Sequence, residues 1–177
     1  MCFPTIAAEH FDWARRELGL DSRFRFQTFS LRSSHYNAEG SVRPEEFVFP
    51  WPENAFTLSF AVSIFTHLSG PATRNYLAEI ARTLQPGGRL FATFYVLDEQ
   101  SMQLVADSKT HPPFSVTTDD GMIGDAASPE AAVAFHAQWL ADALLSAGLT
   151  FDAFYPGRWR HLPVIAHQDI VIAHRPG

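Results

Sequence analysis

The spacing of hydrophobic positions predicts that helices and strands alternate along the chain. Residues 5–18 carry hydrophobic side chains at helical intervals and precede Gly19, a residue type that commonly ends helices. Residues 23–27 alternate strictly between polar residues and phenylalanine, which is typical of a strand buried on one face, here reaching about Phe29. Residues 30–55 show no sustained period and contain several prolines, so we expect a long loop with a helical turn near Glu45.

The middle of the chain predicts a strand, a helix and a second strand. Residues 56–62 form a hydrophobic, partly alternating segment, and residues 71–84 place hydrophobic side chains on one helical face, with Pro71 in the first turn. A tight turn at 85–88 leads into residues 90–97, a nearly continuous hydrophobic run of the kind that a central parallel strand shows. We therefore expect a right-handed βαβ unit.

The last third of the chain predicts two helices and two strands. Asp98 can cap a helix that runs to about residue 107, and Ser128 with Pro129 opens a predicted helix that ends at Gly148. Residues 150–155 and 170–173 are the final predicted strands. Since no linker, repeat or low-complexity tract interrupts residues 1–177, the pattern predicts one α/β domain with a mostly parallel sheet and an antiparallel last strand.

Composition and charge narrow the classes of partner. The chain has 177 residues, 46% of them hydrophobic, and a single cysteine, which excludes an internal disulfide framework and a cysteine-based zinc site. Its formal net charge is -6 and its basic residues are scattered, so nucleic acid is not an expected partner. The start of the chain carries no basic leader and the longest hydrophobic run is too short to cross a bilayer, so we expect a soluble, cytoplasmic protein that does not enter membranes.

Candidate chemistry lies where the predicted strands end, because open α/β sheets bind ligands beyond the carboxyl ends of their strands. His67 follows one such end and can hold a substrate or act as a general base, although a histidine bonded to the backbone at a helix edge is the more common arrangement. Asp98 and Glu99 can form an acid/base pair, but helix capping already explains Asp98. The segments that follow strand ends are Ser30 and Leu31, Ser63 to His67, and Leu97 to Glu99.

Several other site classes find little support. The remaining histidines are dispersed without ligand spacing, so no metal is expected. The acidic turn Asp119-Asp120-Gly121 lacks the spacing and closing glutamate of a calcium loop, and no Gly-x-Ser-x-Gly elbow occurs. The ten glycines include no Gly-x-Gly-x-x-Gly cluster after a strand, so the usual dinucleotide fingerprint is absent.

Two segments carry a resemblance to a known family. The phrase Phe49-Pro50-Trp51-Pro52-Glu53-Asn54-Ala55-Phe56, continuing to Leu68, and the later run from Tyr76 through Gln85-Pro86-Gly87-Gly88 to Leu90 resemble class I S-adenosylmethionine-dependent methyltransferases. In that family the first phrase leads into the fourth strand, and a helix ending in a Pro-Gly-Gly turn leads into the fifth. The resemblance implies a Rossmann-like methyltransferase sheet, S-adenosylmethionine as cofactor and a small-molecule methyl acceptor.

The resemblance also implies roles for particular residues. The segment Ser63, Ile64, Phe65 and Thr66 would face the methionine and sulfonium end of the cofactor. Ser30 and Leu31 would lie beside the adenine, where the family often has an aspartate in place of Ser30. The candidate residues on the substrate side, and thus for catalysis, are His67, Tyr95 and Asp98. Methyl transfer is an in-line displacement at an activated sulfonium, so positioning can suffice.

The same resemblance implies that the sheet is incomplete at its N-terminal side. The family's first strand, its glycine-rich turn and the acidic residue after its second strand have no counterpart, so residues 1–177 read as a truncated domain. Because the missing strand is central in the family, two strand edges would be left unpaired. We expect either that residues 23–29 pair directly with the strand from Phe56, or that two chains exchange elements in a homodimer.

Two functional readings remain open from the sequence. The first is an enzyme, by family, that transfers a methyl group to a small molecule. The second is a non-catalytic remnant that acts as a binding or dimerisation domain. Cofactor affinity of the isolated chain would separate them.

Overall fold

The structure is a computed structural model that describes residues 2–5, 16–17, 21 and 25–177. The chain divides into two compact units, Met1–Pro44 and Glu45–Gly177. The predicted helix at 5–18 lies almost wholly outside the described residues.

The first unit contains a two-stranded parallel sheet. Strand β1 (Cys2–Thr5) pairs with β2 (Arg25–Thr28), with Phe3 opposite Phe26. The strand predicted at 23–29 is therefore confirmed. Its expected pairing with the strand from Phe56 stays a prediction, because that strand belongs to the other unit.

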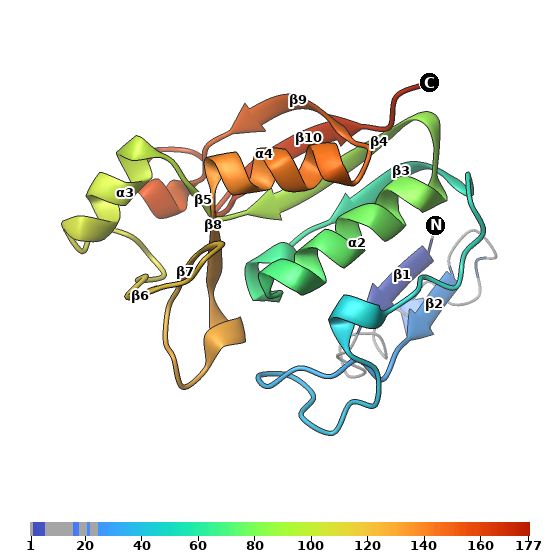
Figure 1. Cartoon of the computed structure of the whole chain (residues 1–177), viewed down its shortest axis with the longest axis horizontal. Coiled ribbons are helices and arrows are strands. Elements are labelled where there is room, and N and C mark those ends of the chain that lie inside the picture. The colour runs from blue at the N-terminus through green and yellow to red at the C-terminus, as the bar shows by residue number, and fades with distance from the viewer. Residues whose placement is uncertain (1, 6–15, 18–20, 22–24) are drawn as a thin grey trace. The chain divides into compact units, whose positions relative to one another are not determined.

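The second unit is built on a four-stranded mixed sheet with the order β3-β4-β10-β9 (Figure 1). Strand β3 (Phe56–Ala61) runs parallel to β4 (Leu84–Phe94), whereas β10 (Asp169–His174) is antiparallel both to β4 and to β9 (Thr150–Tyr155). The antiparallel last strand is thus confirmed. Because β10 runs in the opposite direction, its first residue, Asp169, lies opposite Phe94 at the carboxyl end of β4.

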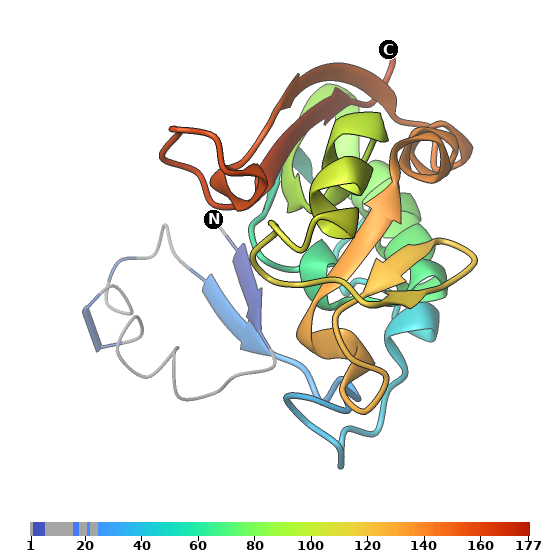
Figure 2. The same ribbon diagram turned by 90° about the vertical axis from the view of Figure 1, so that its left-hand side faces the viewer.

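Two helices cover one face of this sheet (Figure 2). Helix α2 (Gly70–Thr83) begins at Ser69, whose side chain accepts a hydrogen bond from the amide of Ala72, and has proline in its first turn. Helix α4 (Ala137–Ser146) packs beside it. The sheet residues beneath the helices are 0–1% exposed: Leu90, Ala92, Phe94, Val171 and Ala173. This alternation places the main core between the helices and one sheet face.

A smaller four-stranded sheet, with the order β5-β8-β7-β6, lies beyond the end of β4. Its strands are β5 (Val96–Leu97), β8 (Val133–His136), β7 (Gly121–Ile123) and β6 (Val116–Thr117). Helix α3 (Glu99–Ala106) follows β5. A second hydrophobic cluster gathers here around Tyr95, Phe114 and Trp159.

Several predicted features differ from the structure. The tight turn predicted at 85–88 lies within β4, and the main sheet has one parallel pair, β3 with β4, and two antiparallel pairs. The run 90–97 is not one strand: β4 ends at Phe94, and β5 begins at Val96 in the other sheet. The helix predicted from Ser128 to Ala147 contains a 3-10 turn η3 (Pro129–Ala131) and strand β8 before α4 begins. Residues 133–135 are all buried, and pairing with β5 and β7 outweighs the local helix-start signal of Ser128 and Pro129.

Three further single turns complete the described elements: η1 (Pro44–Glu46), η2 (Phe65–His67) and η4 (Arg158–Arg160). The turn η1 confirms the expectation near Glu45. Among the described residues, no helix has the length and hydropathy needed to cross a bilayer.

Candidate functional site

The carboxyl ends of β3 and β4 lie side by side, because these strands are parallel neighbours with Ala61 opposite Ala92. The amino end of the antiparallel β10 reaches the same edge of the sheet. Three segments therefore meet there: residues 62–67 after β3, Thr93 to Tyr95 at the end of β4, and residues 167–168 before β10. This is the position at which open α/β sheets bind ligands.

A network of hydrogen bonds holds the turn after β3. The amide of Ser63 donates to Thr93 Oγ1 at 2.8 Å. The amide group of Gln168 donates to Ser63 Oγ at 3.0 Å and to Thr66 Oγ1 at 3.2 Å, and its carbonyl oxygen accepts from Thr93 Oγ1 at 2.5 Å. Gln168 thus connects both strand ends.

Ser63 adopts an unusual backbone conformation, with φ of 56°. A non-glycine residue in this left-handed region costs about 1–3 kcal/mol and persists where the surroundings determine it. The bonds of Ser63 to Thr93 and Gln168, and the bond between these two side chains, supply such surroundings. The result is an exposed, fixed polar turn directly beyond β3.

The next residues of this turn differ in exposure. Ile64 is 37% exposed, whereas Phe65 and Thr66 are 0% exposed. The ring of Phe65 stacks on Phe94 with centroids 4.6 Å apart. Ser63 and Ile64 can therefore face a ligand, while Phe65 and Thr66 support the turn from within the core.

His67 closes the turn with a bond to the backbone. Its Nδ1 lies 2.8 Å from the carbonyl oxygen of Glu130. Since a carbonyl oxygen can only accept, Nδ1 carries the proton and donates it. A histidine bonded to the backbone is the more common arrangement at such a position. A contact of His67 with a substrate stays a prediction.

Tyr95 lies at the break between β4 and β5 and is 6% exposed. Its ring makes edge contacts with Trp159 at 5.2 Å and with His167 at 6.1 Å. Burial raises the pKa of the Tyr95 hydroxyl, and its hydrogen bond with Gln168 lowers it by a smaller amount. At neutral pH the hydroxyl stays protonated and acts as a hydrogen-bonding group, not as a base.

His167 adds a titratable group to this edge. Burial lowers the pKa of the imidazole below its ordinary value of 6.5, and positive charge on His111 and Arg158 lowers it further. The rings of His111 and His167 lie 6.0 Å apart. A neutral imidazole at this position can accept a proton.

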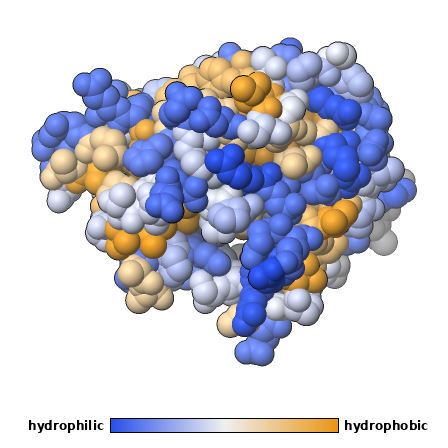
Figure 3. Space-filling view, in the orientation of Figure 1, coloured by the Kyte–Doolittle hydropathy of each residue, from blue (hydrophilic) through white to orange (hydrophobic). Residues whose placement is uncertain are grey.

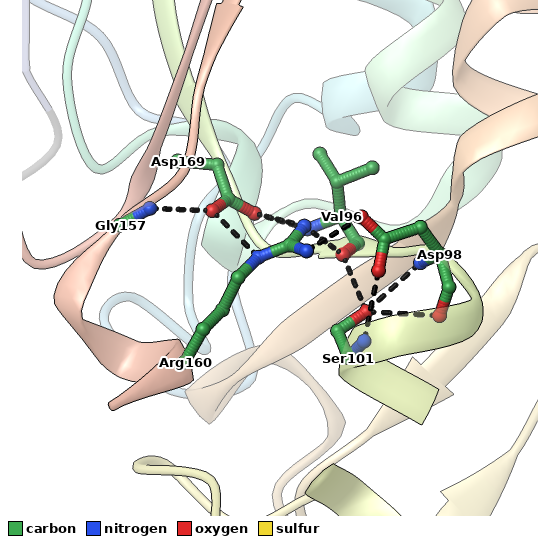
Figure 4. Close-up of polar contacts among 6 residues, drawn as sticks. All are labelled: Val96, Asp98, Ser101, Gly157, Arg160 and Asp169. Carbon is green, nitrogen blue, oxygen red and sulfur yellow. Dashed lines mark hydrogen bonds and ion pairs between the residues drawn. The ribbon is translucent and has the colours of Figure 1, made fainter. Parts of the chain in front are cut away.

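Asp98 takes part in a buried ion-pair network (Figure 4). Its Oδ2 lies 2.6 Å from Arg160 Nη1, and its Oδ1 accepts from the amide of Ser101 at 2.8 Å, forming a capping box for α3. Burial alone would raise the pKa of Asp98, but the bonds from Ser101 and Arg160 outweigh it, so the pKa is lowered. The carboxylate is ionised and engaged in structure.

Arg160 is held from the opposite side by Asp169. The guanidinium is 3% exposed and Asp169 is 0% exposed. Arg160 Nε lies 3.0 Å from Asp169 Oδ1, and Nη2 donates to the carbonyl of Val96 at 2.6 Å. Asp169 also accepts from the amides of Val96 and Gly157. The network fixes the start of β10 and of β5, next to Gln168 and Tyr95.

The remaining predicted residues lie in the first unit, after the end of β2. Leu31 is 7% exposed and forms a bridge with Val42. Ser30 is exposed, and its Oγ accepts from the amide of Ser41 at 3.3 Å. Their expected role beside an adenine stays a prediction, because they belong to the other unit than β3, β4 and β10.

Four residues of this edge were missed from the sequence: Thr93, His167, Gln168 and Arg160. Gln168 and His167 could have been found, because an antiparallel last strand brings the residues before it to the carboxyl ends of its neighbours. Arg160 lies in a loop, and its burial depends on Asp169 and Asp98, which are distant in sequence.

Comparison with known proteins finds one family model and several solved structures that this chain resembles. Residues 9–92 match the family model described as a methyltransferase domain. The chain also aligns over 99% of its length with a solved S-adenosylmethionine-dependent methyltransferase from Methanosarcina mazei, at 14% identity and a TM-score of 0.61, covering 81% of that chain. The fold is that of the S-adenosylmethionine-dependent methyltransferases.

The resemblance to class I methyltransferases is thus confirmed, and two further structures share the fold. One is the N1-methyltransferase of 1,6-didemethyltoxoflavin from Burkholderia thailandensis, solved with that compound and S-adenosylhomocysteine (18% identity, TM-score 0.55, 94% of this chain and 57% of that one). The other is the 4+2 cyclase SpnF (20% identity, TM-score 0.62, 99% of this chain and 66% of that one). The methyltransferase fold therefore also occurs in a protein described by another reaction, so function must be argued from the site.

Proposed function

We propose that this chain forms the catalytic region of an S-adenosylmethionine-dependent methyltransferase that acts on a small molecule. The observation that carries the proposal is the polar turn at Ser63, held in a left-handed conformation by Thr93 and Gln168 at the carboxyl ends of β3 and β4. It occurs in a chain with the methyltransferase fold. Support for a small-molecule acceptor comes from one structural neighbour, whose bound compound is a small heterocycle.

The residues after β3 fit one end of the cofactor. The hydroxyl of Ser63 and the exposed backbone around Ile64 offer a donor and acceptors of the kind that the ammonium and carboxylate of a methionine moiety need, while Gln168 holds this turn in place. Phe65 and Thr66 would hold this segment from the core side. A role of Ser30 and Leu31 beside the adenine stays a prediction, and the sequence has no glycine-rich turn for close backbone approach.

When bound, the cofactor supplies an activated methyl group, and the chain's own residues then need only to place the acceptor and handle its proton. Tyr95 is buried, and its hydroxyl can hold Gln168 in place beside the site. His167, neutral because its pKa is lowered, can take a proton from an acceptor oxygen or nitrogen. Asp98 positions α3 through its cap, and His67 orients the turn through Glu130.

The test is formation of S-adenosylhomocysteine from S-adenosylmethionine in the presence of a panel of small phenolic and heteroaromatic acceptors. We expect turnover with at least one acceptor and a fall of about 100-fold in His167→Gln, the typical contribution of a general base. His161→Gln is the matched control, since His161 ends the η4 turn in a nearby loop. Cofactor binding without turnover by any acceptor would favour the non-catalytic reading.

A second variant tests the turn itself. Gln168→Ala removes the side-chain bonds to Ser63, Thr66 and Thr93, so we expect cofactor affinity to fall by about tenfold or more. Gln138→Ala is the control, because this exposed glutamine on α4 bonds only to Asp142 among the described contacts. Equal affinity in the two variants would remove Gln168 and the Ser63 turn from the proposed site.

A further inference from the structure

Three side chains that can carry positive charge lie close together at the proposed site: His111, Arg158 and His167. The rings of His111 and His167 are 6.0 Å apart, and the charges of His111 and Arg158 both act on the His167 imidazole. They come from the loop after α3, from η4 and from the residue directly before Gln168, and all three belong to the second unit. We call them the cationic cluster.

Backbone hydrogen bonds hold the segments that carry the cationic cluster. The amide of Arg158 donates to the carbonyl of Ala166 at 2.8 Å, and the amide of Trp159 donates to the carbonyl of His167 at 3.0 Å. A longer bond of 3.4 Å runs from the amide of His111 to the carbonyl of Trp159. Because these bonds use no side chain of the cluster, its members are held together without a ligand, and a ligand that binds them has less to order.

The positive charge of Arg158 is not balanced within the described part of the chain. Its side chain is exposed, and in the described residues it forms no ion pair with a carboxylate. The two carboxylates at this edge, Asp98 and Asp169, both pair with Arg160. Arg158 therefore offers a full positive charge to a ligand, since a guanidinium stays protonated in proteins.

Charge is a better guide than hydropathy in this part of the second unit. Around α3, at the left of Figure 3, hydrophilic and hydrophobic residues are interspersed, so the distribution of hydrophobic surface does not mark a ligand there. The chain as a whole has a formal net charge of -6. A group of basic side chains in such a chain is a local feature with a defined preference, because it attracts anions.

We propose that the cationic cluster binds a carboxylate group of the methyl acceptor. The inference rests on the proposed function, because it takes the bound anion to be part of the molecule that is methylated. The guanidinium of Arg158 can donate two parallel hydrogen bonds to a carboxylate, and an imidazole N–H can donate a third. One full positive charge matches a carboxylate better than a phosphate, which carries up to two negative charges. Since Gln168 follows His167 and bonds to Ser63, the acid group lies near the turn that the proposed function assigns to the cofactor.

A bound carboxylate should also change the titration of His167. The groups that face this imidazole are His111 from the loop after α3, Arg158 from η4 and the neutral Tyr95 from the end of β4, while the nearby carboxylates are bound to Arg160. The negative charge offsets the two cationic groups, so the pKa of His167 rises in the complex. By linkage, affinity for the carboxylate rises as pH falls from about 8 to about 6, whereas turnover falls, because a protonated imidazole cannot accept a proton.

Calorimetric titration with hydroxybenzoate isomers and with the corresponding hydroxybenzamides measures the contribution of the charge. Each pair shares a ring and a hydroxyl and differs in the negative charge. We expect at least one hydroxybenzoate to bind about tenfold or more tightly than its amide, with S-adenosylhomocysteine present or absent. Proton NMR of the His167 ring should show a higher pKa with the hydroxybenzoate and no change with the amide.

A pair of arginine variants locates the carboxylate. Arg158→Gln should weaken hydroxybenzoate binding by about tenfold and leave hydroxybenzamide binding unchanged. Arg89→Gln is the matched control, because Arg89 is also exposed and lies near the amino end of β4, opposite His174. It should leave the binding of both compounds unchanged.

Failure of this inference differs from failure of the proposed function. Equal affinity for hydroxybenzoates and hydroxybenzamides, tighter binding of a phenyl phosphate than of any hydroxybenzoate, or equal losses in Arg158→Gln and Arg89→Gln would overturn the carboxylate assignment. Turnover of neutral acceptors alone would also overturn it and leave the proposed function intact. If hydroxybenzoates bind but no acceptor yields S-adenosylhomocysteine, the proposed function fails, and with it the assignment of the anion to a methyl acceptor.

Discussion

At the scale of single residues, the best-defined feature is the buried pair of Arg160 and Asp169. Asp169 is fully buried, and its two oxygens accept bonds from Arg160 and from two backbone amides. Buried charges are tolerated only when paired in this way, so the pair specifies geometry more than it adds stability. It fixes the chain directly before and after the proposed site.

Removing one partner should therefore be costly. We expect Arg160→Met to lower the free energy of unfolding by about 3–5 kcal/mol, because Asp169 is left charged and buried without its cation. Urea denaturation measures the change. Lys109→Met is the control, since Lys109 pairs with Asp107 at the surface and its loss should cost less than about 1 kcal/mol. Similar costs for both variants would contradict the buried-pair interpretation.

The Asp98 carboxylate predicts a pH dependence of stability. The pKa of Asp98 is lower in the folded chain than its ordinary value of 3.8. The ionised group therefore stabilises the fold above that ordinary value, and this contribution is lost as pH falls through the lower, folded pKa. The gap in unfolding free energy between wild type and Asp98→Asn should be present at pH 7 and shrink as pH falls below about 4. A gap that is constant with pH would show that the charge plays no part.

At the scale of elements, the start of α3 depends on Ser101. This serine is fully buried, and its hydroxyl accepts from the amide of Asp98 and donates to the carbonyl of Val96. We expect Ser101→Ala to cost about 1–2 kcal/mol of unfolding free energy, the usual range for a lost cap. Ser146→Ala, at the exposed end of α4, should be nearly neutral in the same denaturation experiment. An unchanged unfolding free energy in Ser101→Ala would show that the capping box does not stabilise α3.

The sequence predicted the helices and strands that are determined by neighbouring residues. It did not predict those that form only by pairing with strands distant in sequence. Helix 71–84 and strand 56–62 were found because proline, helical spacing and alternation agree with the fold. The break at Tyr95 could not be found, because residues 90–97 are hydrophobic throughout and only the pairing of Val96 with Phe135 ends the strand. The start of the 128–147 helix was wrong for the same reason, since β8 forms through two partner strands.

The sequence also predicted only part of the candidate site. The rule that ligands bind at strand ends located the turn at Ser63, which the structure connects to β4 and β10. Phe65 was placed in the ligand segment, but its ring is fully buried against Phe94. The organising side chain, Gln168, precedes the last strand by one residue, and its role depends on that strand being antiparallel to β4.

At the scale of the whole molecule, the sheet of the second unit has two hydrophobic faces but helices on one of them. Leu58 and Phe60 lie on the other face and are more than half exposed. The chain covers 66% of the cyclase and 57% of the Burkholderia enzyme with which it shares the fold. The proposed function therefore depends on whether this chain binds the cofactor.

Calorimetric titration of the purified chain with S-adenosylmethionine and S-adenosylhomocysteine tests this property most directly. The proposed site predicts saturable binding of both compounds at one site per chain, weakened in Gln168→Ala and unchanged in Gln138→Ala. The absence of any binding heat in a sample that is folded by circular dichroism would contradict the central claim. The chain would then have the fold of a methyltransferase without its cofactor site.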